Sequence, residues 1–217
     1  MPVRIVLIHA TSVAIDPILD VFEREWPAAE TVNILDDSLS VDLEAAGSLT
    51  PVIGGRIVSL AEYGRDIGAA AILFTCSAFG SAIDAAKAAV AIPVLKPNEA
   101  MFEDALAAGN RLGLLATFGP SVTSMEAEFY ELARRQSSSA RLETLLVPEA
   151  RSALDQGDGK SHNRLLAAAA PRLAECNAIM LAHFSTSPAL PDVRRAVGCE
   201  VMTSPHSAVA KLKKILS

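Results

Sequence analysis

The sequence has few aromatic residues, few cysteines and no long uninterrupted apolar run. Aromatic residues make up 5% of the 217-residue chain, whereas hydrophobic residues of all kinds make up 51%. A composition dominated by Ala, Leu, Ile and Val is typical of a folded globular protein and argues against disorder. No apolar run reaches the roughly 18 residues that a membrane helix needs, and no signal peptide is recognisable. We therefore expect a cytoplasmic protein with no membrane partner.

The cysteine spacing and the charge exclude several further classes. Cys76, Cys176 and Cys199 are an odd number of cysteines without close spacing, so neither a disulfide framework nor a metal site is expected. A net charge of −6 without a run of Lys or Arg argues against a nucleic-acid partner. The glycine pairs, such as Gly54-Gly55, are weak turn signals and form no dinucleotide-binding pattern. The expected partner is a small molecule.

Short apolar runs alternate with longer Ala-rich stretches of helical character along the chain. Because most of these runs are continuously apolar, they are typical of parallel strands covered by helices on both faces. Eight helices are expected between and after them. The candidate strands are residues 4–8, 31–35, 70–75, 92–95, 111–116, 141–147, 177–182 and 200–203.

Three of these strands recur at one constant spacing. Residues 4–8 align with 111–115, residues 71–76 with 178–183, and residues 92–95 with 199–202, and all three offsets are 107 residues. One match could arise by chance in a chain of alternating elements, but three at one offset indicate a duplicated β-α unit.

The repeat predicts an α/β protein of two pseudo-symmetric flavodoxin-like lobes, each with a four-stranded parallel sheet flanked by helices. The first lobe would contain residues 1–96 and 204–217, and the second residues 97–203. The last helix, from about Pro205, would return to pack on the first lobe. The active site is expected in the cleft between the lobes, where the carboxyl ends of the strands meet.

Reactive side chains stand at these strand ends. Cys76 lies at a strand-to-helix turn, where a helix N-terminus can lower a thiol pKa, although a buried structural cysteine is the alternative. His183 occupies the equivalent position in the second half and would either transfer a proton or only contact the substrate. His9 is a candidate for substrate contact, and His162 is expected to be solvated in a polar loop. Cys176 and Cys199 are expected to be structural.

These residues carry a resemblance to the Asp/Glu racemase superfamily, which includes aspartate, glutamate and hydantoin racemases, maleate isomerase and arylmalonate decarboxylase. It covers the whole chain. The matching segments are the opening strand 4–8, Phe-Thr-Cys-Ser at 74–77, Leu-Leu-Ala-Thr at 114–117 and Leu-Ala-His-Phe-Ser at 181–185.

The resemblance implies a racemase or isomerase that moves the proton alpha to a carboxylate without pyridoxal phosphate, metal or another cofactor. Cys76 would be the catalytic base or nucleophile. Small hydroxyl residues at the strand ends would bind the carboxylate and stabilise an enolate-like intermediate, as donors aimed at developing charge should. The expected substrate-binding residues are His9, Thr11, Ser12, Ser77, Ala78, Thr117, Ser121, Phe184 and Ser185. A homodimer or higher homo-oligomer agrees with the superfamily.

One departure from the superfamily pattern leaves the reaction open. The second cysteine position is His183, so symmetric catalysis by two cysteines is not assumed. The first hypothesis is a racemase with His183 as the opposing acid or base. The second is a decarboxylase of the arylmalonate type, although those enzymes keep the cysteine in the second half. The third is a carboxylate-binding protein that has lost turnover.

Overall fold

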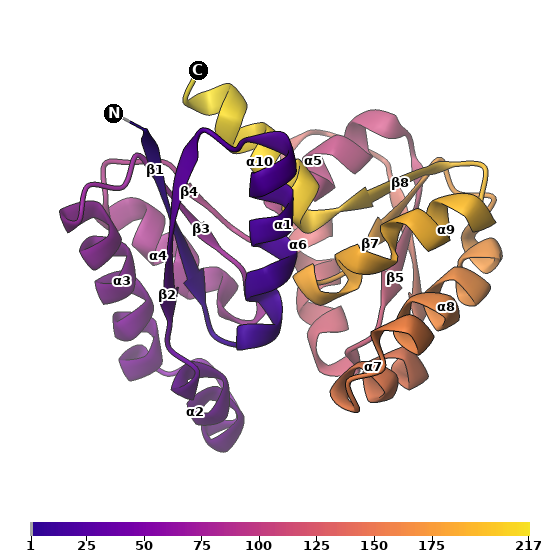
Figure 1. Ribbon diagram of the computed structural model, residues 1–217, viewed down its shortest axis with the longest axis horizontal. Coiled ribbons are helices and arrows are strands. Elements are labelled where there is room, and N and C mark those ends of the chain that lie inside the picture. The colour runs from indigo at the N-terminus through magenta and orange to yellow at the C-terminus, as the bar shows by residue number, and fades with distance from the viewer. Residues whose placement is uncertain (1) are drawn as a thin grey trace. The chain divides into compact units, whose positions relative to one another are not determined.

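The computed structural model describes residues 2–217 and divides them into two compact units. The first unit contains the residues up to 97 together with 208–217, and the second contains residues 98–207. Each unit has one four-stranded parallel sheet, with strand order β2-β1-β3-β4 in the first and β6-β5-β7-β8 in the second (Figure 1). The predicted fold class, two four-stranded parallel sheets flanked by helices, is confirmed.

The first sheet is built from strands β1 to β4, with helices between them. The strands are β1 (Val3–His9), β2 (Ala29–Leu35), β3 (Ala71–Phe74) and β4 (Val94–Leu95). The helices are α1 (Ile15–Glu25), α2 (Ser38–Ala46), α3 (Pro51–Asp66) and α4 (Gly80–Ala89), with short 3-10 turns η1 (Ser12–Ala14) and η2 (Ser77–Phe79). The C-terminal helix α10 (Ser204–Ile215) reaches this unit, where Lys213 Nζ donates to the carbonyl oxygen of Glu25 at 3.1 Å.

The second sheet repeats this plan. Its strands are β5 (Arg111–Ala116), β6 (Arg141–Leu146), β7 (Ala178–Leu181) and β8 (Glu200–Thr203). Its helices are α5 (Glu99–Ala108), α6 (Val122–Arg135), α7 (Pro148–Asp155), α8 (Gly159–Ala169) and α9 (Leu190–Ala196), with 3-10 turns η3 (Gly119–Ser121), η4 (Ala170–Leu173) and η5 (Phe184–Ala189).

The expected number of helices was wrong, because residues 2–217 form ten α-helices rather than eight. The second crossover of each sheet contains two helices. Gly47, with φ of 66°, ends α2, and the Thr50 hydroxyl then caps α3 by accepting from Ile53 N at 3.3 Å. Gly157, with φ of 79°, and the cap residue Asp158 separate α7 from α8 in the same way. Gly54-Gly55 lies inside α3 and is no turn.

Strand register preserves the 107-residue offset of the repeat. Ile5 pairs with Ala71 across β1 and β3, and Leu112 pairs with Ala178 across β5 and β7. Each residue of the second pair lies 107 positions after its counterpart in the first. The two units therefore place equivalent residues at equivalent strand ends.

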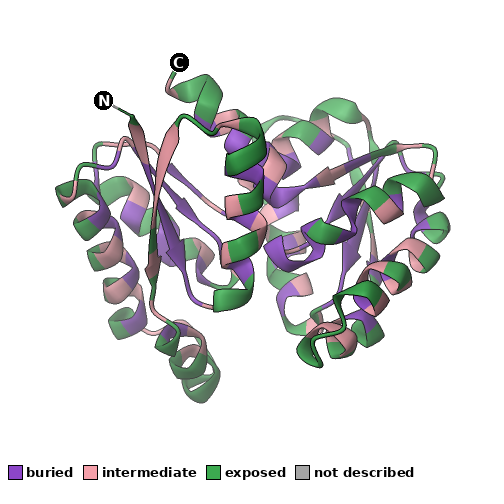
Figure 2. Cartoon of the chain, in the orientation of Figure 1, coloured by how far each residue is buried: buried purple, intermediate pink, exposed green. Residues whose placement is uncertain are grey.

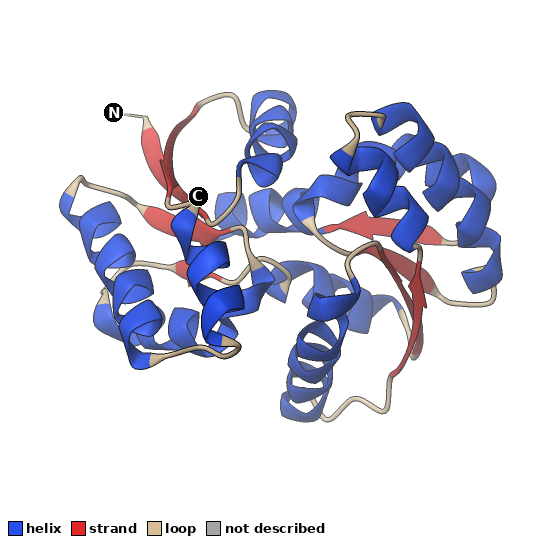
Figure 3. Ribbon diagram, turned by 90° about the horizontal axis from the view of Figure 1, so that it is seen from below, coloured by secondary structure: helices blue, strands red, loops and turns tan. Residues whose placement is uncertain are grey.

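Apolar residues cover both faces of the central strands β1, β3, β5 and β7, as their continuous apolar runs predicted, whereas the edge strands β2 and β6 include polar residues and are largely not buried. In the second sheet, alternate residues face opposite ways: Leu115 and Ile179 pack with α7, α8 and α9, whereas Leu114 and Met180 pack with α5 and α6. The strands are mostly buried and the outward faces of the helices exposed (Figure 2). Helices lie on both sides of each sheet (Figure 3).

Two glycines of α3 provide a matched test of this packing. A Cβ at Gly55 would meet no atom within 4 Å, so Gly55→Ala should raise the free energy of unfolding by about 0.5–1 kcal/mol through helix propensity. A Cβ at Gly64 would lie 3.2 Å from both Ile72 Cδ1 and Val6 Cγ1. Gly64→Ala should therefore be less favourable than Gly55→Ala by roughly 1 kcal/mol or more, measured by urea denaturation.

Ile72→Val removes the crowding Cδ1 methyl group. It should therefore reduce the difference in free energy of unfolding between Gly64→Ala and Gly55→Ala. Equal effects of alanine at both glycines would show that α3 does not press on the sheet at Gly64.

Candidate functional site

The candidate residues of the first unit lie in the loops that follow β1 and β3. These strands are parallel neighbours whose last paired residues are Ile8 and Phe74, so both loops leave the same edge of the sheet. Thr11 is partly exposed and Ser12 is exposed after β1, while Cys76 and Ser77 are half-buried and Ala78 is exposed after β3. The fold therefore brings these five residues to one edge.

His9 ties together the ends of three strands. Its side chain is fully buried, with Nδ1 2.9 Å from Thr75 Oγ1 and Nε2 3.0 Å from Asn33 Oδ1. Because an amide oxygen only accepts, Nε2 carries the proton and Nδ1 accepts from the threonine hydroxyl. Burial lowers the pKa of His9 and the hydrogen bond to Asn33 opposes this effect. In this arrangement His9 orients the loop that carries Cys76, and contact with a substrate would require one of the two bonds to break.

The Cys76 thiol is held in its neutral form. Burial raises its pKa above the ordinary value of 9.0, and a backbone hydrogen bond from Ala78 only partly opposes this. The expected lowering of the pKa by a helix N-terminus does not dominate. A three-residue 3-10 turn, η2, follows Cys76, and the α-helix α4 begins only at Gly80, so the thiol lies about one turn before the N-terminus of α4, where the effect of its dipole is weak.

The second unit has an equivalent pair of loops, after β5 and β7. Ser121 Oγ lies 2.6 Å from His183 Nε2 and 3.0 Å from the carbonyl oxygen of Phe118. A serine hydroxyl has a single hydrogen. When that hydrogen points to the Phe118 carbonyl, His183 Nε2 donates to Ser121 Oγ and Nδ1 keeps a free lone pair.

Two polar atoms in these loops lack partners. His183 Nδ1 and Thr117 Oγ1 are buried and have no hydrogen-bond partner among residues 2–217. Thr117 and His183 follow strands whose last paired residues are Leu115 and Leu181, so they leave the sheet side by side. His183 also has φ of 73°, which a non-glycine residue rarely adopts. Unpaired buried polar groups and backbone strain are features that cluster at functional sites, which makes these loops the candidate site of the second unit.

Burial and a nearby positive charge keep His183 neutral. Burial, followed by the nearby positive charge of Arg151, lowers the pKa of His183 from 6.5 to about 4, and the main chain of Ala182 partly opposes the shift. The Phe118 ring meets the imidazole edge to face, with centroids 6.4 Å apart, and the Arg151 guanidinium lies 5.5 Å from the centroid of the Phe118 ring. At pH 7 the imidazole is therefore a proton acceptor and not an imidazolium.

Phe118, Arg151 and Asn33 were missed in the sequence. They lie in a loop, a helix and an edge strand, respectively. The local sequence around each residue does not predict its contact with a histidine or with the Phe118 ring.

The remaining predicted residues of the second unit are more enclosed. Phe184 is 2% exposed and Ser185 is 8% exposed, both in η5. The Phe184 carbonyl oxygen accepts from Ser187 Oγ at 2.9 Å. The Phe184 ring is a core group, so a contact with substrate would use its main chain.

His162 is not solvated, contrary to the expectation from its polar surroundings. It lies in the first turn of α8 and is buried, with Nδ1 2.8 Å from Asn163 Oδ1. The error arose because α8 is amphipathic, and His162 is on the same face as the buried Leu166 four residues later. Cys176, which is buried, and Cys199, which is half-buried, precede β7 and β8, and both are free thiols.

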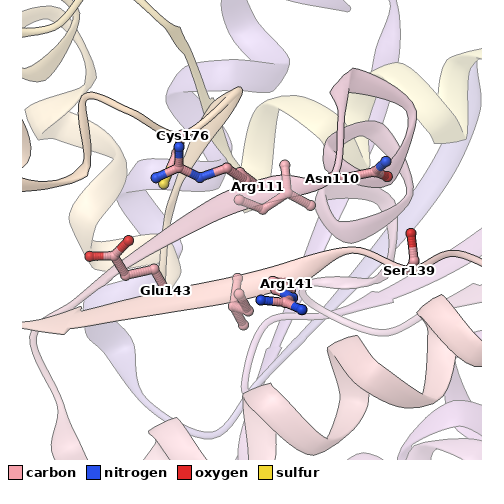
Figure 4. Close-up of a pocket in the computed structure, with 8 residues that line it drawn as sticks. Asn110, Arg111, Ser139, Arg141, Glu143 and Cys176 are labelled. Carbon is pink, nitrogen blue, oxygen red and sulfur yellow. The ribbon is translucent and has the colours of Figure 1, made fainter.

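A cavity of about 390 Å³ lies at the opposite edge of the second sheet, at the amino ends of β5 and β6 (Figure 4). Its lining includes Asn110, Arg111, Ser139, Arg141 and Glu143. None of the predicted catalytic or substrate-binding residues contributes to it.

The described residues contain no group of three or more His, Cys, Asp or Glu side chains that could hold a metal ion. Within residues 2–217, no helix combines the length and the apolar character needed to cross a membrane.

The pKa of His183 predicts a specific dependence of stability on pH. In the unfolded chain the His183 imidazole takes up a proton near pH 6.5, whereas in the folded protein it stays neutral down to about pH 4. The unfolded state therefore binds more protons in this window, so the free energy of unfolding falls as the pH drops from 7 to 4. His183→Gln should reduce this loss by about 3 kcal/mol, measured by urea denaturation at several pH values.

Ser121→Ala keeps the imidazole and should retain most of the pH dependence. If the free energy of unfolding depends on pH in the same way in the wild type and in His183→Gln, His183 is not held neutral by the fold.

Comparisons with known proteins agree with this fold. Residues 55–144, less than half of the chain, match the family model for Asp/Glu/Hydantoin racemase. The matched segment includes Cys76 and ends before His183. No curated protein sequence matches the chain.

Solved structures resemble the chain over almost its whole length. Allantoin racemase from Klebsiella pneumoniae has a TM-score of 0.75 at 16% identity, covering 99% of this chain and 87% of that one. A glutamate racemase from Bacillus anthracis has a TM-score of 0.69 at 16% identity, covering 98% and 81%. An arylmalonate decarboxylase has a TM-score of 0.69 at 17% identity, covering 99% and 92%. The family model therefore confirms the resemblance to the Asp/Glu racemase superfamily over residues 55–144, and the solved structures share the fold over nearly the whole chain.

Proposed function

We propose that this protein catalyses proton transfer at the carbon alpha to a carboxylate, as a racemase or isomerase of a small amino acid, hydantoin or dicarboxylic acid. The observation that carries the proposal is the equivalence of Cys76 and His183. Each follows the third strand of its unit directly, at the carboxyl edge of the sheet, 107 residues apart. The two residues would act on one substrate, one removing a proton and the other returning one.

The hydroxyl groups of the loops would supply the stabilisation that this chemistry needs. Loss of a proton alpha to a carboxylate places negative charge on the carboxylate oxygens, and preorganised donors stabilise that charge most. Thr117 Oγ1 is buried without a hydrogen-bond partner among the described residues. Its hydroxyl could therefore donate to a substrate without breaking an existing hydrogen bond. Thr11 and Ser77 are partly exposed and offer two more donors.

The resting protonation states assign the first proton transfer. Cys76 is a neutral thiol and His183 a neutral imidazole, and Nδ1 would have a free lone pair when Ser121 donates to the Phe118 carbonyl oxygen. In one direction Nδ1 accepts the alpha proton and the thiol donates its own to the carbanion. In the other direction the Cys76 thiolate removes the alpha proton and the His183 imidazolium returns its proton to the carbanion. This step restores the neutral thiol and the neutral imidazole.

A decarboxylase of the arylmalonate type is the second candidate, and one observation favours it. Burial raises the pKa of Cys76, and a neutral thiol is the form that protonates a carbanion. In this reaction the bond to one carboxylate breaks, carbon dioxide leaves, the electron pair stays on the alpha carbon, and the thiol hydrogen is delivered there. A binding protein without turnover is the remaining alternative, and a ligand would then stabilise the protein without forming product.

Deuterium exchange tests the proposal directly. The wild type is incubated in deuterated water with aspartate, glutamate, hydantoins, maleate and arylmalonates, and proton NMR follows exchange at the alpha carbon. Cys76→Ala should reduce exchange by about 100-fold or more, as loss of a general acid or base does. Cys199→Ala is the matched control, a half-buried thiol that follows no strand, and should leave exchange unchanged.

Full exchange by Cys76→Ala on a substrate of the wild type would refute the role of Cys76. Release of carbon dioxide would select the decarboxylase.

The pH profile tests whether Cys76 and His183 act as a pair. In the proposed racemase the two active states, thiol with imidazole and thiolate with imidazolium, carry the same number of protons, so kcat/KM should be level between about pH 4 and pH 9. If the Cys76 thiolate acts as the base without an imidazolium as the opposing acid, kcat/KM should instead rise about tenfold per pH unit between pH 7 and 9, because the pKa of the thiol lies above 9.0. A profile that is the same in the wild type and in Cys76→Ala would show that the thiol does not titrate in the reaction.

A further inference from the structure

The two units differ in charge at one pair of equivalent strand positions. In the first unit, Arg4 on β1 lies opposite Glu30 on β2, and Arg4 Nη2 is 2.9 Å from Glu30 Oε1. In the second unit, Arg111 takes the place of Arg4, and the residue opposite it on β6 is Arg141. The ion pair of the first unit is replaced by two positive charges.

The two arginines of the second unit form no direct ion pair with another described residue. Within residues 2–217, no ion pair joins the guanidinium of Arg111 or of Arg141 to a carboxylate. Like charges directly opposite one another on neighbouring strands destabilise a sheet. Because both arginines are exposed, an anion from solution could reach them and reduce this repulsion.

Both arginines line the cavity of about 390 Å³, which is large enough for a small molecule. Arg111 extends toward Cys176, and Arg141 begins the neighbouring strand beside Ser139 (Figure 4). Glu143 lines the same cavity and offsets one of the two positive charges. The lining therefore has a net charge near +1.

The amino edge of the sheet holds this lining in a fixed geometry. Asn177 Oδ1 accepts from Asn110 N at 3.1 Å and from Arg111 N at 2.9 Å, and the Asn110 carbonyl oxygen accepts from Arg141 N at 2.8 Å. Asn177 can approach this closely because residue 109 is glycine, where a Cβ would stand 2.4 Å from Asn177 Cγ. The backbone that carries both arginines is thus set before any ligand arrives.

We propose that this cavity binds a small molecule through an oxyanion, a carboxylate or phosphate group, which takes the place that the Glu30 carboxylate has in the first unit. Guanidinium groups match the geometry of both oxyanions and form strong charge-assisted hydrogen bonds with them. The site is separate from the candidate catalytic loops of the same unit. Those loops follow the carboxyl ends of β5 and β7, about 20 Å away along a six-residue strand.

Anion titration at constant ionic strength tests this proposal. Inorganic phosphate and acetate are titrated separately into the wild-type protein, and amide chemical shifts of residues 109–113 and 139–143 are followed by NMR. We expect saturable shifts confined to these segments, and the tighter of the two anions identifies the ligand chemistry. Absence of saturable shifts with both anions would overturn the proposal.

Charge reversal at Arg141 provides the decisive variant. Arg141→Glu recreates the Arg4–Glu30 pair of the first unit, so it should weaken anion binding about tenfold or more and raise the melting temperature in the absence of anions. Arg141→Gln removes the charge without adding one and should weaken binding without that rise. Arg24→Glu, at an exposed position of α1, is the control for net charge and should bind like the wild type.

If Arg141→Glu and Arg24→Glu bind anions equally well, the attraction is nonspecific and the proposed site is wrong.

Discussion

The parallel pairing of the first and third strands in each unit is the constraint on which the candidate site depends. It ends at Ile8 and Phe74 in the first sheet and at Leu115 and Leu181 in the second, so the following loops leave the same edge together. Backbone hydrogen bonds fix this register, and buried apolar side chains on both faces prevent it from slipping. A slip of one residue would turn every strand-end side chain to the opposite face.

The same physical cause acts in opposite directions on the two reactive residues. Burial disfavours the charged form of any group. The charged form of Cys76 is an anion, so burial raises its pKa, whereas the charged form of His183 is a cation, so burial lowers its pKa. The duplicated fold therefore holds a neutral thiol and a neutral imidazole at equivalent positions, although the positions differ in residue type.

Departures from local rules concentrate where ligands are proposed to bind. The second unit holds a positive φ at His183, unpartnered atoms on His183 and Thr117, and the like charges of Arg111 and Arg141. The equivalent strand position in the first unit is satisfied internally by the Arg4–Glu30 pair. A fold tolerates such costs when a ligand offsets them, and functional sites are where they are expected.

The sequence by itself determined the eight strands, the 107-residue repeat and the placement of Cys76 and His183 after equivalent strands. These follow from local apolar runs and from a spacing that parallel sheets preserve. Only the tertiary structure decided the burial of His162, the direction of the Cys76 pKa shift, the contact of Arg151 with Phe118 and the cavity between neighbouring strands. Desolvation and side-chain contacts join residues distant in the chain, and no local pattern records them.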